Sequence, residues 1–135
     1  MLYSEATAEL VHLAETLQIP VTTTMAGKSA FPEKHPLSLG SSSGVMNGAA
    51  FHFLRKADVI FAIGSSLTLH GMTTTLPGGK TIIHATNDAI DISKNYDVDH
   101  PILGDARLIL TQFSEACAEL TSRVETDTNG AVAAE

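Results

Sequence analysis

The 135-residue sequence is short of cysteine, of positive charge and of long apolar runs. Its single cysteine, Cys117, excludes a disulfide framework within the chain and favours a reducing compartment such as the cytoplasm. With 8 Lys plus Arg against 15 Asp plus Glu, the formal net charge is −7, which argues against nucleic acid and against an anionic membrane as partners. No apolar run reaches the roughly 18 residues that a membrane-spanning helix needs.

The residues that are present predict one folded domain. Hydrophobic residues make up 44% of the chain, which excludes general disorder, and the length suffices for one core. The apolar pattern stops at Glu125. We therefore expect a domain over residues 1–124 and a tail or cut linker over residues 125–135.

Helix patterns alternate along the chain with strand-like runs. Apolar residues at spacings of three and four predict helices over residues 6–17, 46–57 and 105–124. β-Branched and apolar runs predict strands over residues 21–24, 58–64, 81–86 and 101–103. The runs at 58–64 and 81–86 are apolar almost throughout, as strands buried on both faces of a parallel sheet are. This alternation predicts an α/β fold, a parallel sheet with helices on both faces.

Local signals predict how these elements begin and how they are connected. Ser4 is expected to cap the first helix, Asp88 a short helix over residues 89–94, and Asp105 the last helix. Residues 25–44 are rich in Gly, Pro and Ser and predict a long loop. Loops of this length are uncommon in compact domains and are often functional.

Motifs of known chemistry are weak here. Residues 40–44 match the nucleophile-elbow pattern G-x-S-x-G, but the elbow needs a buried strand before it and residues 35–39 make a poor one. Residues 77–81 resemble the end of a P-loop, yet a β-branched strand follows where a helix is required. The histidines lack zinc-site spacing. We therefore expect no catalytic residue and no metal ligand.

Better candidates for a ligand-binding site are the residues that come directly after the predicted strands. Parallel sheets bind ligands at the carboxyl ends of their strands, where loops and helix N-termini present backbone N–H groups. The candidate cofactor-binding residues are Gly44, Gly64, Ser65, Ser66, Asp88, Gly104 and Asp105. A ribose hydroxyl donating to Asp88 or Asp105 and plain helix capping by these residues are equally good interpretations.

Several short segments follow one another in a specific order. They are residues 19–24, Met25-Ala26-Gly27-Lys28, residues 31–40, residues 57–67, residues 83–88, residues 92–94 and Gly104-Asp105-Ala106. Taken together, over residues 4–114, they resemble the central domain of thiamine diphosphate-dependent enzymes of the acetolactate synthase and pyruvate oxidase group.

The resemblance implies a Rossmann-like (DHS-like) sheet whose first strand precedes the opening helix. The chain is then expected to be a truncated piece of a longer protein. In the strand order 3-2-1-4-5-6 the absent strand is central, so its neighbours keep unpaired edges. Association, a substituting segment from another chain, or rearranged packing would follow.

The resemblance also implies the parent's chemistry. The parent is expected to be a carboligase or decarboxylase of 2-oxo acids, with thiamine diphosphate and Mg²⁺ held by flanking pyrimidine- and diphosphate-binding domains and no turnover by this chain alone. A homo-oligomer is expected. The Gly27-Lys28 loop and residues 40–48 would point toward the cofactor cleft.

Members of the group bind FAD, ADP, coenzyme A or nothing in this domain. Flavin-binding members usually carry an arginine shortly after the glycine that matches Gly64, and an aspartate at the position of Thr86; this chain has Ser65, Ser66 and Leu67 after the glycine. An adenine-nucleotide site therefore fits better than a flavin site. The alternatives are a ligand-free scaffold or oligomerisation module, and a free-standing Rossmann-like NAD-binding domain.

Overall fold

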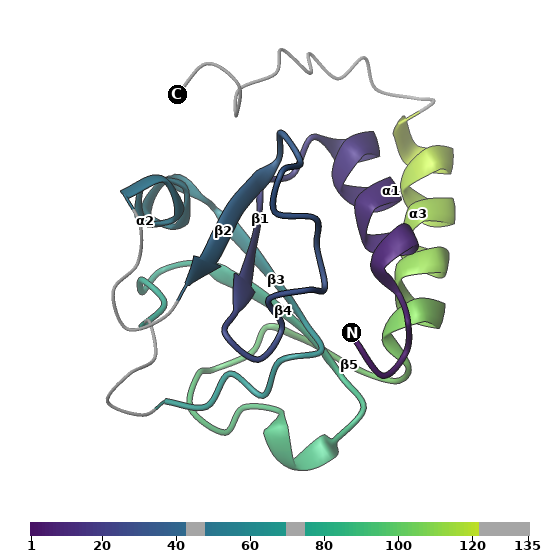
Figure 1. Ribbon diagram of the computed structural model, residues 1–135. Coiled ribbons are helices and arrows are strands. Elements are labelled where there is room, and N and C mark those ends of the chain that lie inside the picture. Colours follow the sequence, from purple (N-terminus) through teal and green to yellow (C-terminus); the bar gives the residue numbers. More distant parts are fainter. Residues whose placement is uncertain (43–47, 70–74, 122–135) are drawn as a thin grey trace.

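The computed structural model describes residues 1–42, 48–69 and 75–121 (Figure 1). The helices are α1 (Thr7–Leu17), α2 (Gly48–Lys56) and α3 (Ala106–Thr121), with one 3₁₀ turn, η1 (Ala89–Asp91). The strands are β1 (Val21–Thr24), β2 (Ser38–Ser42), β3 (Val59–Ile63), β4 (Thr81–Thr86) and β5 (His100–Leu103). The predicted α/β class is confirmed.

The strands form two parallel sheets. One has the order β1-β2 and the other the order β3-β4-β5, and every pair is parallel. Among the described strands, none bridges β1 and β3.

Strand β2 corrects the prediction of an unbroken loop over residues 25–44. Its sequence, Ser38–Ser42, has little β-branched or apolar character, but hydroxyl groups join it to β1. The Thr22 hydroxyl donates to the Gly40 carbonyl (3.0 Å), the Thr23 and Ser41 hydroxyls lie 3.1 Å apart, and the Ser42 hydroxyl donates to the Thr23 carbonyl (3.3 Å). The same bond holds the hydroxyl of Ser42, the serine of the G-x-S-x-G pattern, against β1.

Helices α1 and α3 lie side by side and enclose the main apolar cluster (Figure 1). The cluster consists of Ala6, Leu10, Leu13, Ala14, Phe31, Leu37, Ala106 and Leu110. Leu110 is completely buried, whereas Leu120 near the end of the same helix is exposed. The rings of Phe61 on β3 and Phe113 on α3 stack with centroids 5.0 Å apart. This contact extends the apolar cluster to the β3-β4-β5 sheet.

Two predicted helix starts differ from the structure. Ser4 does not cap α1, whose N-cap is Ala6 without a side-chain bond; its hydroxyl donates instead to Asp105 Oδ2 (2.6 Å). Asp88 caps only the single turn η1 rather than a helix reaching Lys94. The cap by Asp105 is confirmed, since its Oδ1 accepts the N–H groups of Arg107 (2.9 Å) and Leu108 (3.2 Å).

Burial differs sharply between the two predicted core strands. β4 has four buried residues, Ile82, His84, Ala85 and Thr86, as expected of a strand inside a parallel sheet. β3 is apolar along its whole length, yet none of its residues is buried and Val59 is 52% exposed. The prediction that β3 is covered on both faces is therefore wrong for this chain.

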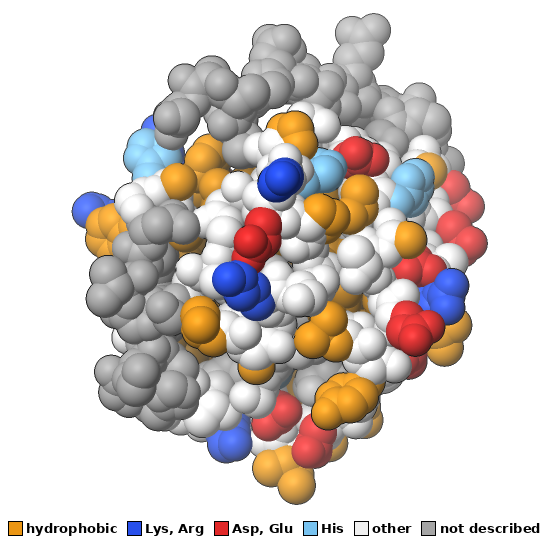
Figure 2. All heavy atoms as spheres, viewed as in Figure 1, with side chains coloured by type: hydrophobic (Ala, Val, Ile, Leu, Met, Phe, Trp, Pro, Cys, Tyr) orange, Lys and Arg blue, Asp and Glu red, His pale blue; other side chains and the backbone are white. Residues whose placement is uncertain are grey.

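The surface bears no membrane-spanning feature within the described residues, because no described helix is both long and apolar enough to cross a bilayer. In the view of Figure 2, apolar side chains are scattered among polar ones, and acidic side chains gather on the right, where α1 and α3 lie. Glu9 on α1 pairs with Arg107 on α3, with Oε1 and Nε 2.7 Å apart.

Leu110→Ala is expected to lower the free energy of unfolding by about 2–5 kcal/mol, because the buried side chain leaves a cavity between α1 and α3. Leu108→Ala, two residues earlier and 64% exposed, should change it by less than about 0.5 kcal/mol. Urea unfolding followed by circular dichroism measures both. Equal losses for the two variants would contradict the placement of the core.

Candidate functional site

Parallel pairing brings three of the predicted segments to one edge of the β3-β4-β5 sheet. Ile63 pairs with Ala85, and Thr86 pairs with Leu103, so the carboxyl ends of the three strands lie level. The residues after them, Gly64 to Ser66, Asn87 to Asp88 and Gly104 to Asp105, therefore share that edge. Gly44 lies outside the described residues.

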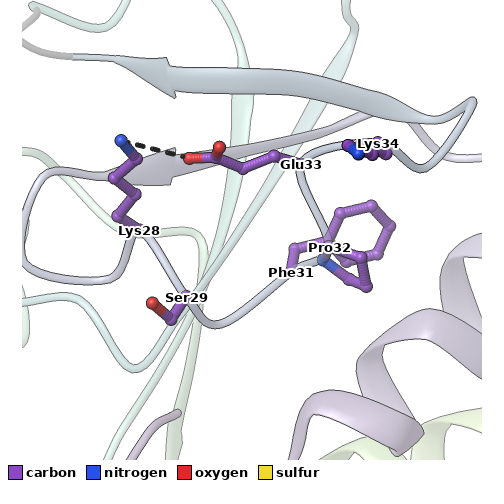
Figure 3. Close-up of a pocket in the computed structure, with 6 residues that line it drawn as sticks. All are labelled: Lys28, Ser29, Phe31, Pro32, Glu33 and Lys34. Atoms are coloured by element: carbon purple, nitrogen blue, oxygen red, sulfur yellow. Dashed lines mark ion pairs between the residues drawn. The ribbon is translucent and has the colours of Figure 1, made fainter.

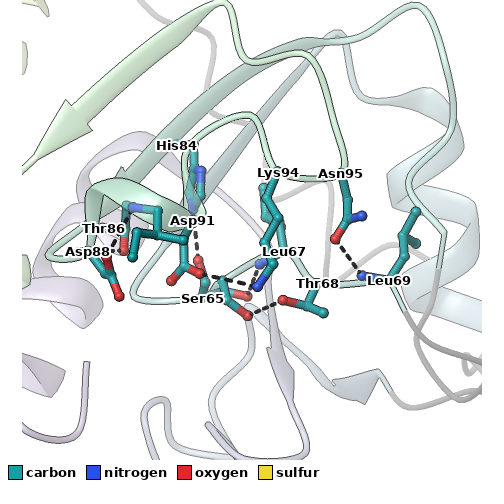
Figure 4. A network of polar contacts seen from close by, with 12 residues as sticks. Ser65, Leu67, Thr68, Leu69, His84, Thr86, Asp88, Asp91, Lys94 and Asn95 are labelled. Atoms are coloured by element: carbon teal, nitrogen blue, oxygen red, sulfur yellow. Dashed lines mark hydrogen bonds and ion pairs between the residues drawn. The ribbon is translucent and has the colours of Figure 1, made fainter.

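The loop after β3 is held by a buried histidine. His84, completely buried on β4, has Nε2 2.8 Å from the carbonyl oxygen of Ser65 (Figure 4). The Ser65 hydroxyl accepts the N–H of Leu67 (3.3 Å), and the hydroxyls of Ser66 and Thr68 lie 2.9 Å apart. These contacts fix a turn in which Leu67 adopts a left-handed conformation, with φ at 49°. Two predicted site residues, Ser65 and Ser66, thus lie on a loop that several hydrogen bonds hold in place.

Asp88 keeps one carboxylate oxygen available. Its Oδ1 accepts the N–H of Ile90 (3.0 Å), and its own N–H donates to the Thr86 hydroxyl (3.2 Å). Within the described part of the chain, no hydrogen bond or ion pair is made by its Oδ2. Asp88 therefore satisfies the capping interpretation and still has an acceptor for a ligand hydroxyl.

Asp105 has structural partners instead. Both carboxylate oxygens of Asp105 are bonded, one to the first turn of α3 and one to Ser4. The Ser4 hydroxyl first, and then the N–H of Leu108, hold the pKa of Asp105 below its ordinary value. A Cβ at Gly104 would make an ordinary van der Waals contact with the Ile109 side chain at 3.4 Å, so packing alone does not require glycine here. The bonds of Asp105 thus connect α3 to the segment before α1, and they need no ligand.

Gly64 lies against the amino end of the chain. Its φ of 62° suits glycine, and a Cβ there would come 2.6 Å from the Met1 nitrogen. Met1 thus occupies the direction in which a side chain at this position would point. In this structure the backbone of Gly64 closely approaches the chain's own terminus.

Lys94 is a residue that the sequence analysis did not select for the site. Its Nζ lies 3.8 Å from Asp91 Oδ1, and its side chain is 43% exposed. Figure 4 draws this pair beside Ser65 and Asp88, at the same edge of the sheet. A long, solvent-exposed ion pair contributes little to stability, so the ammonium group can turn toward an anion at small cost.

A hollow lies on the segment between β1 and β2. It is lined by Lys28, Ser29, Phe31, Pro32, Glu33 and Lys34 and has a volume of about 510 Å³ (Figure 3). Lys28 pairs with Glu33 at 3.4 Å, and both side chains are more than half exposed. The hollow thus offers one exposed ion pair and few converging polar groups. That the Gly27-Lys28 loop points toward a cofactor cleft stays a prediction.

The described residues contain no group of three or more His, Cys, Asp or Glu placed to hold a metal ion. They also supply no cluster that fits the diphosphate and Mg²⁺ of thiamine diphosphate, whose recognition needs carboxylate and carbonyl ligands around the metal. No step of thiamine chemistry is assigned to the side chains of this chain.

A model of the family "Thiamine pyrophosphate enzyme, central domain" matches residues 1–113. The chain belongs to this family. The central domain resembles a "Probable acetolactate synthase large subunit" of Methanococcus aeolicus, with 40% identity over 114 residues, 83% of this chain and 19% of that protein. A protein of the same name from Methanocaldococcus jannaschii is 39% identical over 123 residues, 89% of this chain and 21% of the relative.

A solved structure shows the same fold. A protein from Mycobacterium smegmatis, described as a thiamin diphosphate-dependent enzyme, superposes with a TM-score of 0.65 and 23% identity, over 83% of this central domain and 22% of the other chain. The central domain therefore spans about one fifth of the length of the relatives it matches. The resemblance stated from the sequence is confirmed at the level of the family and the fold.

The stability of the central domain should depend on pH through Asp105. Because its folded pKa is lowered, the carboxylate contributes stability at pH values above the ordinary pKa of about 4. That contribution is lost as the pH falls through the lowered folded pKa. Asp105→Asn keeps a cap but lacks the charge, so the stability difference between wild type and variant should shrink as pH falls from about 6 to about 3.

Urea midpoints across this pH range measure the effect of Asp105. Asp97→Asn, an exposed aspartate on the loop before β5, provides the matched control and should follow the wild type in parallel. A profile for Asp105→Asn that is also parallel to the wild type would sink the assignment of the stabilising charge to Asp105.

Gly64→Ala should destabilise the central domain more than Gly79→Ala. Both glycines have positive φ, so alanine costs backbone strain of about 1 kcal/mol or more at each. Only at Gly64 would the new Cβ also collide with Met1, whereas the space around Gly79 is open. Thermal unfolding compares the two variants. Equal shifts in Tm would show that Met1 does not lie against Gly64 in solution.

Proposed function

We propose that this chain is the adenine nucleotide-binding central domain of an acetolactate synthase-like, thiamine diphosphate-dependent carboligase or decarboxylase. In that setting it holds the flanking catalytic domains in position within a homo-oligomer, while the thiamine diphosphate and Mg²⁺ bind on those domains. The family and the acetolactate synthase relatives support the parent class.

The observation that carries the nucleotide proposal is the free oxygen of Asp88 beside the loop Ser65–Ser66. A carboxylate after a parallel strand accepts hydrogen bonds from ribose hydroxyls, and Asp88 Oδ2 is available for this. Lys94 supplies a positive charge within the same network for a diphosphate (Figure 4). Ser65 and Ser66 stand after the strand where flavin-binding relatives are expected to have an arginine, so ADP fits better than FAD.

A ligand-free scaffold is the second candidate, and specific observations favour it. Gly64 and Asp105 each have a structural partner within the chain, so the presence of these two residues needs no ligand. The two candidates differ only in what Asp88, the serines and Lys94 do. They are separated by direct titration.

Isothermal titration of the chain with ADP should give a saturable heat. Asp88→Asn retains the cap on η1 but loses the charged acceptor, and should weaken ADP binding about tenfold or more, since hydrogen bonds to charged groups contribute about 1.5–3 kcal/mol. Lys94→Gln should weaken it as well. Asp97→Asn removes the same charge away from the proposed site and should leave the affinity unchanged.

The titration also separates the alternatives. Heat with FAD and none with ADP would replace the adenine nucleotide with a flavin. No heat with either ligand would reject nucleotide binding and leave the scaffold function.

A further inference from the structure

Only two of the buried residues that the structure describes are polar, and both belong to β4. They are His84, which is completely buried, and Thr86, which is 4% exposed. Side chains two positions apart in a strand point to the same face of the sheet, so these two residues share a face with the buried Ile82. An apolar side chain would fill either position without the cost of burying polar atoms. The bonds that the two side chains make therefore indicate why they are polar.

His84 bonds the loop that follows β3. Its Nε2 lies 2.8 Å from the Ser65 carbonyl oxygen, which can only accept a hydrogen bond, so the ring proton is on Nε2. Nδ1 then carries a lone pair; it is buried and has no hydrogen-bond partner among the described residues. In the described part of the chain, the ring thus makes one hydrogen bond, and that bond goes to the loop on which Ser65 and Ser66 lie.

The loop after β3 depends on this bond for its connection to the sheet. Leu67 has φ at 49°, a left-handed value that leucine rarely adopts. Two contacts lie within the loop itself: the N–H of Leu67 donates to the Ser65 hydroxyl (3.3 Å), and the hydroxyls of Ser66 and Thr68 lie 2.9 Å apart. Of the described hydrogen bonds of residues 65–68, only the one from His84 comes from a residue of the sheet.

Thr86 bonds the loop that follows its own strand. Its hydroxyl accepts the N–H of Asp88 (3.2 Å), while Asp88 Oδ1 accepts the N–H of Ile90 (3.0 Å). Asp88 is therefore held at its backbone and at one carboxylate oxygen, which restricts where its Oδ2 can lie. Figure 4 draws the bond from Thr86 to Asp88 and the bond from His84 to Ser65 at the same edge of the sheet.

We propose that His84 and Thr86 are positioning residues, which together set the two halves of the proposed nucleotide site relative to each other. The inference rests on the proposed function. Because both side chains come from one face of β4, a single strand places the loop after β3 through His84 and the carboxylate of Asp88 through Thr86. Neither side chain is exposed, so each acts on the ligand through the residue that it bonds.

The Thr86 half of the pair is tested with two nucleotides, ADP and a dideoxy-ADP that lacks both ribose hydroxyls. Isothermal titration of the full chain should show that ADP binds about tenfold or more tightly than the dideoxy form, because Asp88 accepts hydrogen bonds from the ribose. Thr86→Val keeps the shape of the side chain but has no hydroxyl, and should reduce this ratio of Kd values about threefold or more. Thr86→Ser keeps a hydroxyl and should restore the ratio of the wild type.

The His84 half should respond differently. His84→Leu leaves the Ser65 carbonyl without this donor and should weaken both nucleotides about three- to tenfold, with the ratio of the two Kd values unchanged. His84→Gln can place an amide N–H at the position of Nε2 and should restore both affinities. The matched control is Thr81→Val at the other end of β4, where the Thr81 hydroxyl makes no hydrogen bond with the described residues. It should change neither affinity.

The outcomes separate this inference from the proposed function. A lower ratio for Thr86→Val that Thr86→Ser recovers supports the pair, because a mere loss of stability would weaken both nucleotides alike. An unchanged ratio for Thr86→Val, or full affinity for His84→Leu, overturns the inference while nucleotide binding stands. No heat from the wild type with ADP rejects the proposed function and the inference together.

Two further results keep the test decisive. The Thr86 variants decide by themselves if His84→Leu does not fold. Long-range ¹H–¹⁵N spectra of the unliganded chain check the His84 bond without nucleotide and should find the ring proton on Nε2. A proton on Nδ1 would contradict the bond to Ser65 and overturn the role of His84.

Discussion

The apolar cluster between α1 and α3 is the contact on which the rest of the fold depends. No described hydrogen-bonded ladder joins the β1-β2 sheet to the β3-β4-β5 sheet, so side chains must hold the two together. Phe31 and Leu37 bring the first sheet's connecting segment into the cluster, and the Phe61–Phe113 stack brings in the second. The hydrogen bond from Ser4 to Asp105 and the Glu9–Arg107 pair then tie the ends of the two helices together.

Patterns within one segment made much of this fold predictable. The apolar runs identified β3 and β4, and the 3.6-residue spacing identified α1 and α3. β2 was not predictable in this way, since Ser38–Ser42 becomes a strand by pairing with β1, about 18 residues earlier in the chain, and hydroxyl bonds add to that backbone pairing. The exposure of β3 could not be predicted from its sequence either, because the burial of a strand depends on what lies beside it.

The candidate site, too, was predictable from the sequence in part only. Register brings the residues after three strands to one edge, and this follows from parallel pairing, which the sequence predicts. What each residue does there depends on distant partners: Ser4 bonds Asp105 from 101 positions away, and Met1 lies against Gly64. Among the residues that the structure describes, Asp88 has only local partners, and these leave its Oδ2 free. The position of Lys94 beside this edge becomes visible only once the loop after η1 is placed beside the sheet.

The most direct test of the joining cluster is native-state hydrogen exchange of the unliganded chain at increasing, sub-denaturing urea. If the cluster couples the two sheets into one cooperative unit, the free energies of exchange of the β2-bonded amide of Val21 and the β4-bonded amide of Gly64 should converge on one global value. Two values that stay separate up to the unfolding transition, with the β1-β2 sheet opening first, would contradict the account.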